Sequence, residues 1–95
     1  MSRIIDAERI LKALANRRRL MIVHFLNTKG SASVGNIAEH VSLSFAATSR
    51  HLRVLAVASL VETEQINTTV NYSLPKSRHV ALDTVLRKAI ICLFN

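Results

Sequence analysis

The 95 residues, 49% of them hydrophobic, are enough for one domain with a modest core, and a helical chain this short often completes its core by dimerising. Thirteen Lys and Arg against six Asp and Glu give a formal net charge of +7, which favours a nucleic acid as partner, with a basic surface that serves only solubility as the alternative. The single cysteine, Cys92, excludes a disulfide within the chain, and no apolar run approaches the roughly 18 residues of a membrane helix, so we expect a cytoplasmic protein without a signal peptide or membrane contact.

The first two predicted helices are amphipathic and apolar, respectively. Apolar residues recur at three- and four-residue spacings over residues 3–14, which predicts a helix with one apolar stripe. Asn16 can cap a second helix that runs to about residue 27 and is apolar on most sides, so we expect it at the centre of the core. Arg17 to Arg19 crowd its first turn, where the helix dipole disfavours cations. They either contact phosphate, or extend into solvent or pair with Asp6 and Glu8.

The next segment has the spacing of a helix-turn-helix. Gly30 is expected to end the second helix, and a short third helix follows from Val34 to Val41. After the turn Ser42-Leu43-Ser44, the Ser44 hydroxyl can cap a fourth helix that begins near Phe45. At about 100° per residue, one face of this helix turns inward (Thr48, His51, Leu52, Leu55) and the other outward (Ala46, Ser49, Arg50, Arg53, Val57). In a helix-turn-helix the second helix lies in the major groove of DNA.

The outward face carries the candidates for reading DNA. Arg50 is the first of them, because only a guanidinium fork can donate two hydrogen bonds to O6 and N7 of guanine; a contact to phosphate alone is the alternative. Ser49 and Arg53 accompany it, and Ala46 permits close approach. His51 could serve as a pH switch or a ligand, but its place on the inward face favours a packed, hydrogen-bonded histidine.

The pattern then changes to strands and returns to a helix. Residues 60–66 and 69–74 are rich in β-formers and flank Asn67-Thr68, which predicts a hairpin that Pro75 closes. Helical periodicity resumes over residues 78–94. The predicted fold is therefore mainly α with a small β-hairpin, in the order of four helices, hairpin and fifth helix, within a single domain over residues 1–95.

Several motifs, in the same order, resemble the ArsR (arsenic repressor-like) family of winged helix-turn-helix regulators. Residues 11–20, LKALANRRRL, are similar to its opening L-A-x-x-x-R-L-x-I-L, and residues 33–39, SVGNIAE, to its S-V-G-E-L-A helix. Leu43-Ser44 with residues 49–55, SRHLRVL, resembles its L-S-Q-x-x-V-S-x-H-L-x-x-L. Leu60-Val61 and residues 70–74, VNYSL, correspond to its wing strands. The likeness covers roughly residues 10–74.

The resemblance implies a homodimer whose first and last helices form the interface, and which represses transcription by binding an inverted-repeat operator. It assigns residues 3–14 and 78–95 to dimerisation, 33–56 to the helix-turn-helix and 60–74 to the wing. The expected interface residues are Ile4, Ile5, Ile10, Leu11, Leu86, Ile90, Leu93 and Phe94. The expected DNA contacts are Ser44, Phe45, Ala46, Ser49, Arg50, Arg53, Arg18, Arg19, Asn67 and Thr68.

The chain departs from the metal-sensing members of the family. A soft or borderline ion needs several thiolate, imidazole or carboxylate ligands that converge. Ser33, Val34 and Gly35 stand where those members carry a Cys-x-Cys, and the last helix offers only His79, Asp83 and Cys92, with the last two about two and a half turns apart. We therefore expect no metal site and no cofactor, and the effector is unknown.

Other departures concern DNA contact. Phe45 replaces a frequent Gln, so it either contacts a thymine methyl or turns inward, and we favour packing. The wing has Glu62 and Glu64 but no cation, so its contribution should be small. Ser59 replaces a Gly that commonly adopts a left-handed conformation, at a strain of about 1 kcal/mol.

The function that these patterns favour is sequence-specific DNA binding by a homodimeric transcriptional repressor without a metal. A non-specific nucleic-acid binder or a protein-interaction module on the same fold is the alternative. An enzyme is not expected, because no nucleophile, base and orienting acid group together and no Gly-rich phosphate loop is present.

Overall fold

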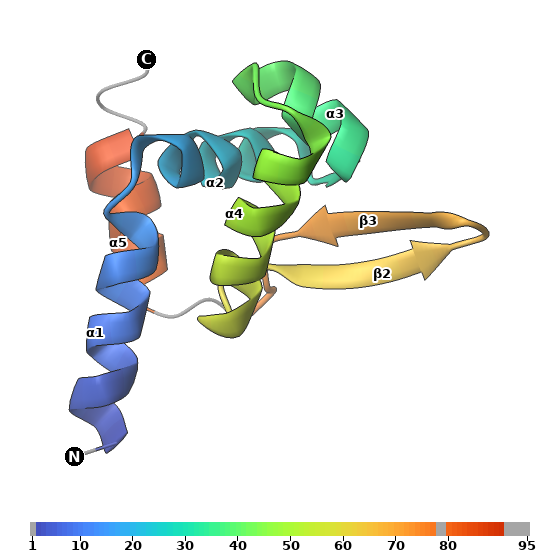
Figure 1. Ribbon diagram of the computed structural model, residues 1–95. Coiled ribbons are helices and arrows are strands. Elements are labelled where there is room, and N and C mark those ends of the chain that lie inside the picture. The colour runs from blue at the N-terminus through green and yellow to red at the C-terminus, as the bar shows by residue number, and fades with distance from the viewer. Residues whose placement is uncertain (1, 78–79, 91–95) are drawn as a thin grey trace.

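The computed structural model describes residues 2–77 and 80–90 of the chain, and the helices and hairpin follow the predicted order (Figure 1). The helices before the hairpin are α1 (Ser2–Leu14), α2 (Arg17–Lys29), α3 (Val34–Val41) and α4 (Phe45–Val57). The hairpin, or wing, consists of β2 (Glu62–Ile66) and β3 (Thr69–Ser73). The last helix begins as α5 (Val80–Thr84) and continues as the π-helical segment η1 (Val85–Ile90).

Local capping sets the helix boundaries that the sequence predicts. The Asn16 side chain accepts a hydrogen bond from the backbone N–H of Arg19 at 3.1 Å, and the Ser44 hydroxyl accepts one from Ala47 at 3.0 Å. Gly30 has φ 95°, which favours glycine, and its N–H donates to the carbonyl of Leu26 at 2.9 Å. Both predicted N-caps and the predicted end of α2 at this glycine are therefore confirmed.

A third strand, β1 (Ser31–Ser33), was not predicted from the sequence. It pairs antiparallel with β3, with Ala32 opposite Tyr72, so the sheet has the order β1-β3-β2. Three residues with two serines are too few to show alternation. The strand forms because β3 offers it a free edge and because Ala32, 5% exposed, reaches the core.

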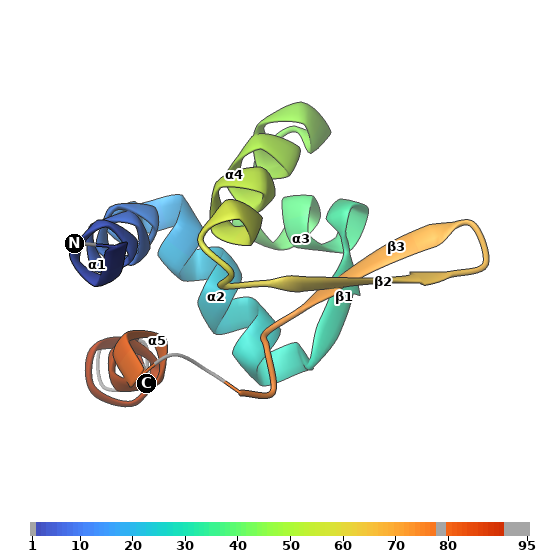
Figure 2. The ribbon, with the colours of Figure 1, turned by 90° about the horizontal axis from the view of Figure 1, so that it is seen from below.

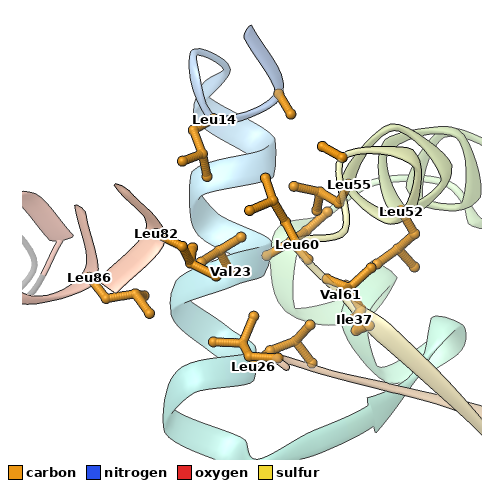
Figure 3. Packing of buried hydrophobic residues seen from close by; sticks show 14 of the residues in the cluster. Leu14, Val23, Leu26, Ile37, Leu52, Leu55, Leu60, Val61, Leu82 and Leu86 are labelled. Atoms are coloured by element: carbon orange, nitrogen blue, oxygen red, sulfur yellow. The ribbon is translucent and has the colours of Figure 1, made fainter. Parts of the chain in front are cut away.

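Helix α2 lies at the centre of the core, as its apolar composition predicts. Its Ile22, Val23 and Leu26 are at most 1% exposed. Figure 3 shows Val23 and Leu26 between side chains that come from both sides, with Leu82 and Leu86 on one side and Leu52, Leu55, Leu60 and Ile37 on the other. The described part of the chain therefore has one continuous core, against which α4 is packed through Leu52 and Leu55.

The terminal helices and the wing lie at opposite ends of the molecule. In both views α1 and α5 occupy one end and the β2–β3 hairpin projects from the other, with α2 between them (Figures 1 and 2). Figure 2 also shows α4 on one side of α2 and α5 on the opposite side. Over residues 80–90, the last helix therefore does not cover the outer face of α4 within one subunit.

Ser59 has the left-handed conformation expected where relatives carry glycine, with φ 58°. A residue with a side chain in this conformation is strained by roughly 1–2 kcal/mol. Glycine would remove the strain, but part of the gain would be lost because glycine has more conformational entropy in the unfolded chain. We expect Ser59→Gly to raise the free energy of unfolding by up to about 1 kcal/mol in urea denaturation at fixed protein concentration. Ser42→Gly, also at φ 58°, provides a second site for the same measurement. If both substitutions lowered the free energy of unfolding, the backbone at Ser59 and Ser42 would not be strained.

Candidate nucleic-acid interface

Helix α4 divides into the two faces that its sequence predicts. Thr48, Leu52 and Leu55 are 0% exposed, and the Thr48 hydroxyl donates a hydrogen bond to the carbonyl of Ser44 at 2.9 Å. The side chains predicted to face outward are exposed, except for Ser49, which is half-buried; the exposed ones are Ala46, Arg50, Arg53 and Val57. A firmly packed inner face and a short, basic outer face suit a helix that enters the major groove.

Phe45 does not pack inward, so that expectation is wrong. Its side chain is 65% exposed at the first position of α4. Leu43, two residues earlier, packs against the core instead. Phe45 therefore presents an aromatic ring beside Ala46 at the end of the helix that a helix-turn-helix directs at base edges.

Arg19 is the most extensively bonded side chain near α4 in the described part of the chain. Its Nε donates to the carbonyl of Ala13 at 2.6 Å and its Nη2 to the carbonyl of Lys12 at 3.2 Å. Its Nη1 lies 3.3 Å from Nδ1 of His51 on α4. One guanidinium thus joins the end of α1 to the middle of α4.

Arg18 has an equivalent role at another helix end. Its Nη1 donates to the carbonyl of Val41, the last residue of α3, at 2.7 Å. The last carbonyls of a helix lack partners within it and carry partial negative charge. The arginines at the start of α2 are therefore placed by the ends of α1 and α3, an arrangement that was not predicted from the sequence.

Neither Asp6 nor Glu8 provides the acid partner considered for these arginines. Glu8 lies 3.7 Å from Lys12. Arg17 is exposed in the same turn and remains accessible to phosphate. Contacts of Arg18 and Arg19 with DNA remain predictions. Each guanidinium would have to donate hydrogen bonds to a phosphate while it keeps those to the backbone carbonyls.

His51 is half-buried and hydrogen-bonded, as its place on the inner face predicts. Burial lowers its pKa, and the nearby charges of Arg19, Arg50 and Arg18 lower that pKa further. A neutral ring fits the geometry, because the guanidinium of Arg19 can only donate and Nδ1 must accept.

The wing is exposed over residues 62–70. Asn67 adopts φ 58° at its tip, and Nε2 of Gln65 donates to the Asn67 carbonyl at 3.3 Å. Asn67 and Thr68 are therefore accessible for hydrogen bonds to DNA, while Glu62 and Glu64 add negative charge to the same hairpin.

Apolar side chains on α1 form a surface that the described chain does not cover. Ile4, Ile5 and Leu11 are 69%, 50% and 58% exposed. Ile10 and Leu86, also expected at the subunit interface, lie in the subunit's own core at 7% and 1% exposure, so they offer little area to a partner. The Ile90 side chain, Leu93 and Phe94 fall outside the described residues.

The described residues contain neither a cluster of metal ligands nor a membrane span. No three or more His, Cys, Asp or Glu side chains among residues 2–77 and 80–90 group together as ligands for an ion. Asp83 pairs with Arg87 at 2.8 Å, while His79 and Cys92 fall outside these ranges. Within the same ranges, no helix is both long and apolar enough to cross a membrane.

Comparison with known proteins agrees with this geometry. Residues 16–63 match the family model described as bacterial regulatory protein, arsR family. The chain is 37% identical over 86 residues to the transcriptional activator HlyU of Vibrio cholerae serotype O1, which covers 90% of this chain and 78% of that protein.

Solved structures give the same result. Reduced HlyU from Vibrio cholerae superimposes with a TM-score of 0.82 at 30% identity, over 99% of this chain and 95% of that one. The homodimeric winged helix-turn-helix DNA-binding domain Mb0332 from Mycobacterium bovis gives 0.81 at 25% identity, over 98% and 82%. The transcriptional repressor BigR from Xylella fastidiosa gives 0.77 at 26% identity, over 99% and 91%.

Proposed function

The chain belongs to the arsR family of bacterial regulatory proteins and is a DNA-binding transcriptional regulator; on this basis we propose that it is a metal-independent repressor whose dimer binds an inverted-repeat operator. The observation that supports this proposal most is the outer face of α4, where Phe45, Ala46, Arg50 and Arg53 are exposed. The opposite face of the helix packs into the core through Thr48, Leu52 and Leu55. We expect it to act in the cytoplasm, where bacterial DNA lies.

The dimer supplies the second recognition helix. Ile4, Ile5 and Leu11 present an apolar surface on α1, and a related winged helix-turn-helix domain from Mycobacterium bovis is a homodimer. Two-fold symmetry of such a dimer is matched by an operator of two inverted half-sites. We expect the two α4 helices to lie about 34 Å apart, one turn of DNA.

Repression is the regulatory outcome that we propose, by occupation of promoter DNA. One relative is named an activator and another a repressor, so the position of the operator decides the outcome. Transcription in vitro from a template that carries the selected operator across the promoter should fall as protein is added. A rise in transcript would make the protein an activator.

Selection from random duplexes is the main test. We expect the selected sequences to converge on an inverted repeat, and light scattering to give a dimer at micromolar concentration. The alternative, a non-specific basic binder, predicts that the selected duplexes do not converge on one sequence. It also predicts that duplex DNA and RNA of equal length bind with the same affinity and the same salt dependence. The exposed wing, with two acids and no cation, instead supports the other alternative, a protein-interaction module on the same fold.

Arg50→Ala tests the base-reading role of α4. If Arg50 donates two hydrogen bonds to a guanine, its loss should weaken operator binding by about 1–3 kcal/mol and relax the preference at a single base pair. Binding would be measured on duplexes with each base pair substituted in turn at one salt concentration. Arg17→Ala, which removes an exposed cation outside α4, is the control and should weaken all duplexes alike. A uniform loss in Arg50→Ala would limit this residue to a phosphate contact.

A further inference from the structure

Arg19 lies where three helices meet. It belongs to the first turn of α2, it donates to the carbonyls of Lys12 and Ala13 at the end of α1, and its third hydrogen bond joins it to His51 on α4. Its own backbone N–H is held by Asn16. A guanidinium presents its donors in one rigid plane, so these acceptors constrain the two helices relative to each other.

Apolar packing alone does not close the space between α1 and α4. A cleft of about 510 Å³ separates them; its walls are Ile5, Glu8, Arg9, Lys12, Ala13, Arg19, Arg53, Val54 and Val57. Val54 and Val57, in the last turns of α4, are 42% and 63% exposed, so this part of α4 packs only weakly against α1. Arg19 bridges this cleft, because its hydrogen bonds reach both helices.

We propose that Arg19 is a positioning residue for DNA recognition, whose bonds to the α1 carbonyls and to His51 set the angle between the dimerisation helix and the recognition helix. The inference rests on the proposed function, in which α1 contributes to the subunit interface. Any change in the angle between α1 and α4 is then duplicated by the symmetry of the dimer. Arg19 thereby determines the separation of the two recognition helices, and so the spacing of half-sites that the protein accepts.

The chemistry of this joint depends on arginine and on a neutral histidine. Lysine carries the same charge but has a single ammonium, which cannot address three acceptors in one plane. His51 accepts at Nδ1 only when that nitrogen carries no proton. The charged groups that face it, Arg18 and Arg19 from α2 and Arg50 from α4, act with burial to lower its pKa and keep it in the accepting form.

The first test compares duplexes that contain both half-sites with duplexes that contain one. Arg19→Lys keeps the charge, so we expect binding to a single half-site to change less than threefold, while binding to the full operator falls at least tenfold. The preference for one half-site spacing should also broaden across a series of spacers. Lys29→Arg, an exposed residue at the opposite end of α2, is the control and should change neither value. Equal losses on both duplexes would instead make Arg19 a phosphate contact.

The second test needs no DNA. Spin labels at Asp6→Cys on α1 and Ala46→Cys on α4, both exposed, report the relation of the two helices after Cys92→Ser and dilution with unlabelled protein. We expect a narrow distance distribution that broadens or shifts in Arg19→Lys and stays unchanged in Arg17→Lys. His51→Leu removes the hydrogen-bond acceptor and should also broaden the distance distribution. His51→Gln, whose side-chain carbonyl oxygen can accept, should keep the distribution narrow.

The histidine ring gives a signature that a general loss of stability would not produce. In ¹⁵N spectra, the pKa of His51 should rise in Arg19→Gln and stay unchanged in Arg17→Gln. Unchanged distances together with an unchanged His51 would overturn the inference and leave the proposed function intact. If no duplex is selected while the distances respond as expected, the proposed function fails and the structural role of Arg19 stands.

Discussion

Leu52→Ala is expected to lower the free energy of unfolding by about 2–5 kcal/mol, which is a large part of the roughly 5–15 kcal/mol that stabilises a small domain. Leu52 is 0% exposed and lies behind the outer face of α4, in the same cluster as Leu55 and Ile37 (Figure 3). Truncation removes buried methyl groups and leaves a cavity between α4 and the core. Recognition by α4 depends on this packing, because an exposed face can be presented rigidly only from a fixed helix.

Urea denaturation followed by circular dichroism, at one protein concentration, measures this loss. Val54→Ala is the matched control on the same helix, because Val54 is 42% exposed and its truncation should cost about 0.5 kcal/mol or less. Similar losses in the two variants would mean that α4 is not fixed through its inner face. That result would also remove the basis for assigning Arg50 and Ser49 to the outer one.

Leu11→Glu should convert the dimer into a monomer. Leu11 is 58% exposed on α1 and lies with Ile4, Ala7 and Ala15 along a shallow apolar depression. Glu8 and Lys12 line the same depression. A carboxylate placed there would lose its water when a second subunit docks against this apolar surface, which is unfavourable. Loss of the dimer removes the high effective concentration of the second recognition helix, so operator affinity should fall by about 10²–10⁴-fold.

Light scattering should therefore give about one subunit mass, 10.6 kDa, for Leu11→Glu and twice that value for the unaltered protein. Ile66→Glu adds the same charge to a similarly exposed side chain, 48%, on the wing, and the dimer should persist. Binding to a single half-site should be kept in Leu11→Glu. A dimer that survives the substitution would place the interface elsewhere than on this face of α1.

What could be predicted from the sequence depends on how local the interactions are. Ser44 as a cap, the burial of Leu52 and Leu55 and the exposure of Arg50 and Arg53 follow from a side chain's own helix turn and from a period of 3.6 residues. The hairpin around Asn67 also follows from a local pattern, whereas the left-handed conformation of Ser59 was expected only from the resemblance to a family that carries glycine there. Local patterns alone were therefore sufficient to predict the order of the helices and the hairpin and the two faces of the recognition helix.

The remaining features were decided only when distant segments met. The bond from Arg18 to Val41 spans 23 residues and that from Arg19 to His51 spans 32, and no local pattern in the sequence reports such pairs. The exposure of Phe45 was likewise decided by the tertiary structure, in which Leu43 packs against the core and Phe45 does not. Composition and periodicity determined that α4 has an outer face with two arginines. Only the tertiary structure determined which contacts hold that face in place, because the carbonyls at a helix end accept hydrogen bonds from whichever donors the fold brings near them.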